Sequence, residues 1–370
     1  MSHYPQITSN DFTRDPVELI SDQIQACQRV FSSGRWILSE AVSRFEYEWS
    51  QYCKCDHAIG VANGMDAIEI SLRCLGIGPG DEIITTSLTA FATTLAILRC
   101  GALPVYADID IATGCLDPIS ASKCVTPATR AILVVHLYGR ASKLDQFVDL
   151  CASYGIDLIE DCAQAHGASF QGAPVGTHGV AGAWSFYPTK NLGAIGDGGA
   201  ITTSCSELAE LARSIRNYGQ SDRYHHDVLG LNSRLDELQA AILLERLHYL
   251  PLWTERRRSI ALRYWEEITN TNLTLLEKPL HPSNHVHHLF IIRSSERQRL
   301  QDHLLKQGIN ALIHYPIPCH RQPPIQASIS SSPSLPNTTI FADTCLSLPI
   351  HPYLTDREVS QVISACNSFV

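Results

Sequence analysis

Residues 156–199 read IDLIEDCAQAHGASFQGAPVGTHGVAGAWSFYPTKNLGAIGDGG, and this stretch decides the fold class. It opens on a short apolar segment, Ile156–Glu160, and Asp161 follows directly. Apolar residues at successive positions are typical of a strand that is buried on both faces, as strands of parallel sheets are. We therefore predict a strand here that delivers Asp161 to the carboxyl edge of a sheet, where open α/β folds bind ligands.

Similar apolar segments recur on both sides of this stretch and alternate with segments of helix length. The predicted strands are Ala58–Ala62, Glu82–Thr85, Leu103–Ala107, Ala131–His136, Ile156–Glu160 and Ala200–Thr203. The predicted helices are Asp66–Leu75, Ala90–Cys100 and Lys143–Tyr154, preceded by amphipathic stretches at 16–31 and 39–53. Strand–helix–strand alternation predicts an α/β fold with a mostly parallel sheet covered on both faces.

The pattern changes after Ser233, which marks the start of a second, smaller unit. Helices are predicted over Ser233–Leu250, from Pro251 onward, over Glu296–Gln307 and after the capping-box pair Thr355 and Glu358. Strands are predicted at Leu289–Arg293 and near Ala311–His314. We predict a large domain over 1–248 and a small C-terminal α+β domain over 249–370. The serine- and proline-rich segment 322–337 is predicted to be a flexible loop.

Composition and charge limit the classes of function. The 370 residues suit one large domain and a smaller one, and 45% hydrophobic with 18% charged residues indicates a folded globular chain. A net charge of −9 argues against nucleic acid and anionic membranes as partners. No apolar run approaches the ~20 residues of a membrane helix, and the opening residues MSHYPQITSNDF do not resemble a signal peptide.

The cysteines and histidines do not predict a metal site. The thirteen cysteines include no CxxC pair and mostly stand singly in apolar segments, which favours free thiols in a reducing, cytoplasmic compartment. The crowded histidines are His281, His285, His287 and His288. The segment HVHHLFIIR is predicted to be a strand, so neighbouring histidines would point to opposite faces. The basic run Arg256–Arg258 is predicted to be a solvated helix face.

Lys190 and Asp161 together predict pyridoxal phosphate as the cofactor. Either residue alone could be ordinary, since an aspartate can cap a helix and a lysine can lie in solvent. The coenzyme needs an amine for a Schiff base and an acid that keeps its pyridine nitrogen protonated. Its phosphate could be held at the helix N-terminus of ANGMD by Gly64 and Met65, and by polar side chains at Ser185 and Asn232.

Eight motifs give the chain its resemblance to a known family. They are GVANGMDAI, GIGPGDE, VVHLYGR, IEDCAQAHGA, SFYPTKNLGAIGDGGA, GLNSRLDELQAAIL, LIHYPIPCH and LSLPIHP. The resemblance as a whole extends from about Gly34 to Pro352. In this combination the chain resembles the pyridoxal-phosphate-dependent nucleotide-sugar aminotransferases of the DegT/StrS type. The resemblance implies fold type I, a homodimer with shared active sites, glutamate as amino donor with 2-oxoglutarate as its product, and a nucleotide-sugar acceptor.

The resemblance also implies roles for individual residues. Lys190 would be the Schiff-base lysine and proton shuttle, and Asp161 would pair with the pyridine nitrogen. The remaining cofactor residues would be Gln164 near the 3-hydroxyl, Gly64, Met65 and Ser185 at the phosphate, and Asn232 reaching the phosphate from the partner subunit. The expected substrate-side residues are Tyr187, Tyr218 and Tyr315. Relatives often place an aromatic residue over the coenzyme ring where this chain has Ala90, so the stacking residue stays unassigned.

The expected reaction is amination of a keto-sugar, and several alternatives stay open. Resemblance in the Lys190 segment favours C3 of a dTDP-3-keto-6-deoxyhexose over C4 or a UDP-linked 3-keto sugar. Some relatives have histidine in place of this lysine and remove a hydroxyl from the sugar, so Lys190 disfavours a dehydratase. A regulatory homologue without catalysis is disfavoured because Lys190, Asp161 and Gln164 are all present.

Overall fold

A seven-stranded sheet forms the centre of the computed structural model, which describes residues 7–326 and 333–370. The strand order is β1-β9-β8-β5-β4-β2-β3. Its strands are β1 (His57–Val61), β2 (Glu82–Thr86), β3 (Leu103–Ala107), β4 (Thr129–Val135), β5 (Asp157–Asp161), β8 (Ala181–Ser185) and β9 (Gly199–Thr203). The pairs from β8 through β3 are parallel, whereas β9 runs antiparallel to both of its neighbours. The predicted α/β class with a mostly parallel sheet is confirmed.

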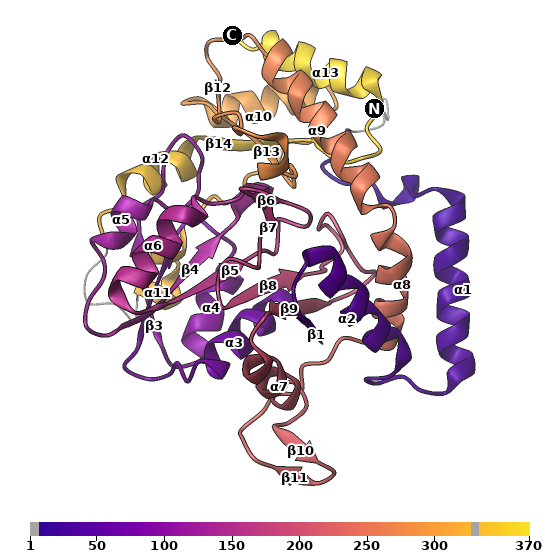
Figure 1. The fold of residues 1–370 in the computed structure, drawn as a ribbon. Helices are drawn as coiled ribbons and strands as arrows, with labels where there is room; N and C mark the ends of the chain where they lie inside the picture. Colours follow the sequence, from indigo (N-terminus) through magenta and orange to yellow (C-terminus); the bar gives the residue numbers. More distant parts are fainter. Residues whose placement is uncertain (1–6, 327–332) are drawn as a thin grey trace.

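Helices cover both faces of this sheet (Figure 1). The helices of this part of the chain are α1 (Val17–Ser33), α2 (Glu40–Cys53), α3 (Gly64–Cys74), α4 (Phe91–Arg99), α5 (Pro118–Ser122), α6 (Leu144–Tyr154), α7 (Ser206–Ile215) and α8 (Glu237–Leu247). In β4, Ile132 and Val134 pack with α2, α6 and α8, while Ala131 and Leu133 pack with α3, α4 and α7. Alternate residues of one strand therefore enter two separate cores, which explains the continuous apolar runs.

A second, three-stranded antiparallel sheet lies beyond the end of α8 (Figure 1). It contains β12 (Thr274–Leu275), β13 (Phe290–Arg293) and β14 (Cys345–Leu348), and the helices of this region are α9 (Leu250–Glu267), α10 (Arg297–Lys306), α11 (Pro323–Gln326), α12 (Pro336–Thr344) and α13 (Asp356–Asn367). The apolar faces of α9, α10 and α13 form a core with this sheet around Ile260, Ile292 and Val362, whereas α11 and α12 pack against residues of the large-sheet region such as Tyr106 and Ile109. The boundary after residue 248 stays a prediction.

Several predicted elements differ from the structure. The helix expected over Ser233–Leu250 begins only at Glu237, and the strand expected at Ala311–His314 is reduced to one bridge between Leu312 and Ser347. The strand expected over the segment HVHHLFIIR, residues 285–293, begins only at Phe290, because His287 has a left-handed backbone, φ +46°. The predicted loop 322–337 is helical at both of its described ends, in α11 and α12, and residues 327–332 lie outside the described structure.

Two segments lie at the periphery of the molecule (Figure 1). One is α1, whose outward side includes Val17, Ile24 and Phe31. The other is the small hairpin of β10 (Gln220–Asp222) and β11 (His225–His226) below α7, with Tyr224 and Leu229 mostly exposed. A further two-stranded hairpin, β6 (Ser169–Phe170) and β7 (Ala173–Pro174), links β5 to β8. Among the described helices, none has the length and apolar character needed to cross a bilayer.

Candidate active site

Asp161 is the last residue of β5, at the carboxyl edge of the large sheet. Its side chain is buried and accepts hydrogen bonds from the Thr93 hydroxyl at 2.9 Å and from the Ala163 amide at 3.1 Å. Burial raises the pKa of this carboxyl, and the two hydrogen bonds and the positive charge of Lys190 act in the opposite direction. A cation placed against Asp161 would hold the carboxylate ionised.

Lys190 lies in the loop that follows β8, in electrostatic contact with Asp161. Part of the residue remains accessible, but its amine is densely surrounded by protein. This burial lowers the pKa of the amine to about 8, although Asp161 favours the charged form. The amine therefore loses its proton near neutral pH more readily than an ordinary lysine does, and the deprotonated amine can act as a nucleophile or base.

Gln164 connects Asp161's loop to the C-terminal region. Its carbonyl oxygen accepts from the Tyr138 amide at 2.6 Å, and its amide nitrogen donates to the Tyr315 hydroxyl at 3.1 Å. The Tyr138 hydroxyl in turn donates to the His314 carbonyl at 2.6 Å. These bonds bring the predicted residues Gln164 and Tyr315 together, 151 residues apart in the chain.

Gly64, Met65 and Ser185 lie together, as predicted for a phosphate site. Gly64 and Met65 occupy the first turn of α3, where backbone amides have no partner within the helix. Asn63 caps this helix by accepting from the Asp66 amide at 2.8 Å. A Cβ at Gly64 would lie 2.6 Å from the Ser185 Cβ, so only glycine allows this close approach. The result is a helix N-terminus with a hydroxyl beside it, a favourable arrangement for an anion.

The other three predicted residues lie outside this group. Asn232 and Tyr218 flank the base of the β10–β11 hairpin, where the Tyr218 amide donates to Leu231 and the Tyr218 ring stacks on Arg234. Both side chains are substantially exposed, as is Tyr187. In this single chain they face solvent, so their predicted roles require another chain or a bound substrate.

From the sequence, no role in the site was assigned to four residues near Lys190 and Asp161. The Thr93 hydroxyl donates to Asp161. The positive charge of Lys190 contributes to lowering the pKa of three histidines: His166, His288 and His314. Burial, followed by this charge, lowers the pKa of His166 to about 3 and that of His314 to about 4. The only available signal was the position of His166 and His314 inside the AQAHGA and HYP motifs.

Arg257 and the histidine segment correct two predictions. Arg257 is buried, not solvated: its guanidinium donates to the carbonyls of His287, His288 and Ile350. The segment that contains His285 and His287 is not a strand, because β13 begins only at Phe290, and the two imidazole rings stack with centroids 3.9 Å apart. Phe91, next to Ala90, packs with a cluster that contains Tyr106.

The comparisons with known proteins agree with this geometry. The profile of the DegT/DnrJ/EryC1/StrS aminotransferase family matches residues 17–367. The chain belongs to this family. It is a pyridoxal-phosphate-dependent aminotransferase of fold type I.

Individual relatives cover almost the whole chain. A dTDP-3-amino-3,4,6-trideoxy-α-D-glucose transaminase of Streptomyces venezuelae is 42% identical over 98% of this chain and 95% of its own. A dTDP-3-amino-3,6-dideoxy-α-D-galactopyranose transaminase of Aneurinibacillus thermoaerophilus is 45% identical over 93% and 94%. The crystal structure of S. venezuelae DesV with a ketimine intermediate superposes with a TM-score of 0.95, at 42% identity and 98% coverage of both chains.

The residues of this chain fit the coenzyme. A second solved structure, Bacillus subtilis NtdA with bound PMP, shows the same fold at 31% identity, with a TM-score of 0.88 over 98% of this chain and 86% of that one. Here a buried amine at Lys190 lies near a buried carboxylate at Asp161, and an open helix N-terminus lies beside Ser185. Amine, acid and anion site are the three groups that pyridoxal phosphate requires.

Proposed function

We propose that the protein transfers an amino group from glutamate to C3 of a dTDP-3-keto-6-deoxyhexose in amino-sugar biosynthesis. The observation that carries this proposal is the 42% identity, over 98% of the chain, to a dTDP-3-amino-sugar transaminase. Relatives whose names specify UDP sugars, such as the UDP-2-acetamido-2-deoxy-3-oxo-D-glucuronate aminotransferase of Pseudomonas aeruginosa, are 38% identical. These names share amination at C3, which favours C3 over C4.

The chemistry is assigned to a small number of side chains. When bound, pyridoxal phosphate would supply an aldehyde that reacts with amines and a ring that withdraws electrons from the carbon that loses or gains a proton. Lys190 holds the coenzyme and then moves a proton between the substrate carbon and the coenzyme's C4′, for which a pKa of about 8 is well suited. Asp161 keeps the proton on the pyridine nitrogen, while Gly64, Met65 and Ser185 bind the phosphate.

The substrate side is assigned to tyrosines and to a second copy of the chain. Tyr315 is fixed by Gln164 and faces the same group of residues. The active enzyme is a homodimer in which the β10–β11 hairpin carries Asn232 and Tyr218 toward the partner's phosphate site. Exposed Tyr224 and Leu229 on this hairpin support the proposal, since large apolar side chains in solvent are typical of interfaces. Tyr187 lies beside Lys190 in sequence and would contact the sugar.

We assign the enzyme to the cytoplasm and regard regulation as the second candidate function. The thirteen cysteines, all within the described ranges, are free thiols, which supports a reducing compartment. One relative, 41% identical, is named a pleiotropic regulatory protein of Geobacillus stearothermophilus. A purely regulatory protein has no need for a lysine whose pKa is lowered to about 8 beside a buried aspartate.

The reverse reaction tests the proposed substrate. Purified protein is incubated with 2-oxoglutarate and, in parallel, with dTDP-3-amino-, dTDP-4-amino- and UDP-3-amino-sugars, and glutamate formation is measured. We expect glutamate only, or fastest, with the dTDP-3-amino sugar. Faster deamination of a 4-amino sugar would contradict C3, and a colourless protein that forms no glutamate with any sugar would favour regulation.

A further inference from the structure

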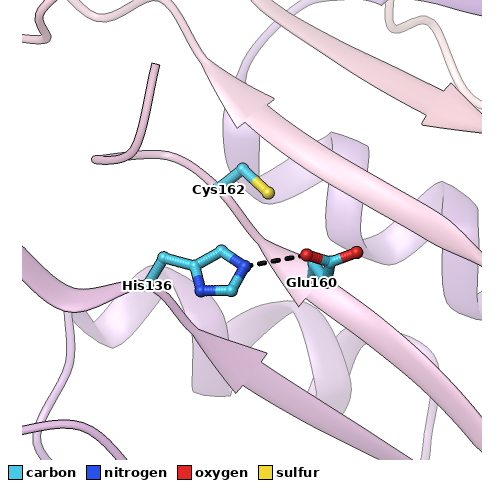
Figure 2. A group of neighbouring side chains, drawn as sticks. All are labelled: His136, Glu160 and Cys162. Carbon is cyan, nitrogen blue, oxygen red and sulfur yellow. Dashed lines mark hydrogen bonds and ion pairs between the residues drawn. The ribbon is translucent and has the colours of Figure 1, made fainter. Parts of the chain in front are cut away.

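Glu160, which precedes Asp161 in β5, is buried on the opposite face of the sheet. Figure 2 shows its carboxylate beside His136 and Cys162. These three side chains have a spacing that could hold a metal ion. The carboxylate oxygens of Glu160 and both ring nitrogens of His136, however, are already engaged in hydrogen bonds.

The Glu160 carboxylate accepts four hydrogen bonds. One oxygen accepts from the Gly176 amide at 2.7 Å and from His136 Nε2 at 2.9 Å, and the other accepts from the amides of His178 and Gly179, each at 2.8 Å. Successive backbone amides that converge on one point form an anion site, and here the anion is a side chain of the same protein. These donors lower the pKa of Glu160 despite its burial.

His136 is fixed as a donor toward Glu160. Its Nδ1 accepts from the Ser142 amide at 3.1 Å, so the proton of the neutral ring is on Nε2. The backbone of the same residue holds Asp161, because the His136 amide donates to the Asp161 carbonyl at 3.0 Å. The next amide, that of Cys162, donates to the Ala183 carbonyl at 2.8 Å in β8.

The segment that supplies the three amides packs closely against β5 and β8. A Cβ at Gly179 would lie 2.3 Å from the Leu158 carbonyl oxygen, and a Cβ at Gly176 would lie 2.6 Å from the Trp184 ring. Glu160 is therefore hydrogen bonded to a closely packed segment between β5 and β8, and one residue later the same strand ends in Asp161.

We propose that Glu160 is a positioning residue, which together with His136 fixes the end of β5 so that the Asp161 carboxylate is held against the pyridine nitrogen of the coenzyme. This inference rests on the proposed function. Glu160 acts through the backbone of β5 and does not itself touch the coenzyme.

The test compares two buried glutamates that each accept three backbone amides but lie in different parts of the fold. Glu237 is also buried and also accepts three backbone amides, from Ser39, Ala41 and Val42, but it caps α2 and has no bond to β5. Neither oxygen of Glu160 can be replaced by an NH2 group without opposing two donors, so Glu160→Gln breaks the arrangement. Glu237→Gln makes the same chemical change elsewhere.

The measurements are the dissociation constant of pyridoxal phosphate, the pH midpoint of the bound coenzyme's absorbance band, and the melting temperature. We expect Glu160→Gln to raise the dissociation constant by about fivefold or more and to shift the midpoint, because the ring nitrogen loses a fixed acid. Glu237→Gln should lower the melting temperature and leave both coenzyme readouts unchanged. Equal melting losses in the two variants, with wild-type coenzyme readouts in both, would overturn the inference.

A second pair of variants decides the question if Glu160→Gln does not fold. His136→Gln keeps an N–H donor near the position of Nε2, whereas His136→Leu removes it. We expect the coenzyme readouts of His136→Gln to lie closer to wild type than those of His136→Leu, and indistinguishable readouts would overturn the inference. Wild-type protein that binds no coenzyme would instead refute the proposed function, and the inference with it.

Discussion

The hydroxyl group of Thr93 holds the carboxylate of Asp161 in place. It donates to the carboxylate at 2.9 Å and is itself linked to the Thr89 hydroxyl at 3.0 Å. Hydrogen bonds to a charged acceptor contribute roughly 1.5–3 kcal/mol. Thr93→Val keeps the shape of the side chain and should weaken coenzyme binding about tenfold, measured by absorbance titration.

The neighbouring Thr94 provides the control for this substitution. It is equally buried in α4, but its hydroxyl accepts from Tyr106 at 3.2 Å and makes no bond to Asp161. Thr94→Val should leave coenzyme affinity unchanged. If Thr93→Val behaves like Thr94→Val, the assignment of Asp161 as the residue at the ring nitrogen is wrong.

At the residue scale, the sequence predicts the parts of the site that are local. Lys190, Asp161 and Gln164 lie in one continuous stretch that carries its own motif, and they lie near one another in the structure. Thr93 is 68 residues from Asp161, and no local pattern links the two. Such contacts depend on strand order, which a single sequence does not contain.

At the scale of elements, the other strands of the large sheet were predicted from the sequence, whereas β8 was not. Its sequence AGAWS is poor in β-branched residues, so propensity does not indicate a strand. The small residues are needed because a Cβ at Gly182 would lie 2.5 Å from the Cα of Gly176. Close packing in the centre of the sheet thus overrides the propensity on which the prediction relied.

The start of α13 is an element for which sequence and structure agree. Thr355 accepts from the Glu358 amide at 3.2 Å, and Glu358 accepts from the Thr355 amide at 2.8 Å, which is the predicted capping box. Thr355→Ala should lower the free energy of unfolding by about 1 kcal/mol, measured by urea denaturation, with coenzyme affinity unchanged. Ser364→Ala, at an exposed position within the same helix, is the control. Equal stability of the two variants would contradict the capping role.

At the scale of the whole molecule, the shared active site predicts complementation between two inactive variants. Lys190→Ala removes the amine, and Asn232→Ala removes the proposed phosphate contact from the partner. In a mixed dimer one site carries both defects and the other carries neither. Unfolding and refolding the two variants together should therefore restore about a quarter of wild-type activity, by random pairing of subunits.

The same mixing experiment with a single variant is the control. Refolding Lys190→Ala alone should restore no activity. If the mixture also stays inactive while native mass spectrometry shows mixed dimers, Asn232 and Lys190 act in the same subunit, and the proposed contribution of the hairpin to the partner's site is wrong.

Buried histidines make the stability of the whole molecule depend on pH. Burial lowers the pKa of four histidine side chains to about 3 or 4. They are His166, His287, His314 and His351. In the unfolded chain they protonate near pH 6.5, so below this value the unfolded state binds more protons. Stability is therefore complete above about pH 6.5 and falls as the pH decreases toward 4.

Melting temperatures between pH 7.5 and pH 4.5 test this dependence. We expect a progressive decrease below about pH 6.5. His287→Phe, which keeps an aromatic ring against Trp265, should make the decrease less steep. A flat profile in the wild type, or an unchanged slope in the variant, would show that these histidines are not buried in the neutral form.

The attachment of the coenzyme to Lys190 is the claim from which the whole account follows, and one labelling measurement tests it most directly. Purified protein is incubated with pyridoxal phosphate, reduced with borohydride, digested and examined by mass spectrometry. We predict a yellow protein before reduction and, afterwards, the mass of the reduced coenzyme on the peptide that contains Lys190. Label on a different lysine, or no stable label in a protein that remains colourless, would contradict the account.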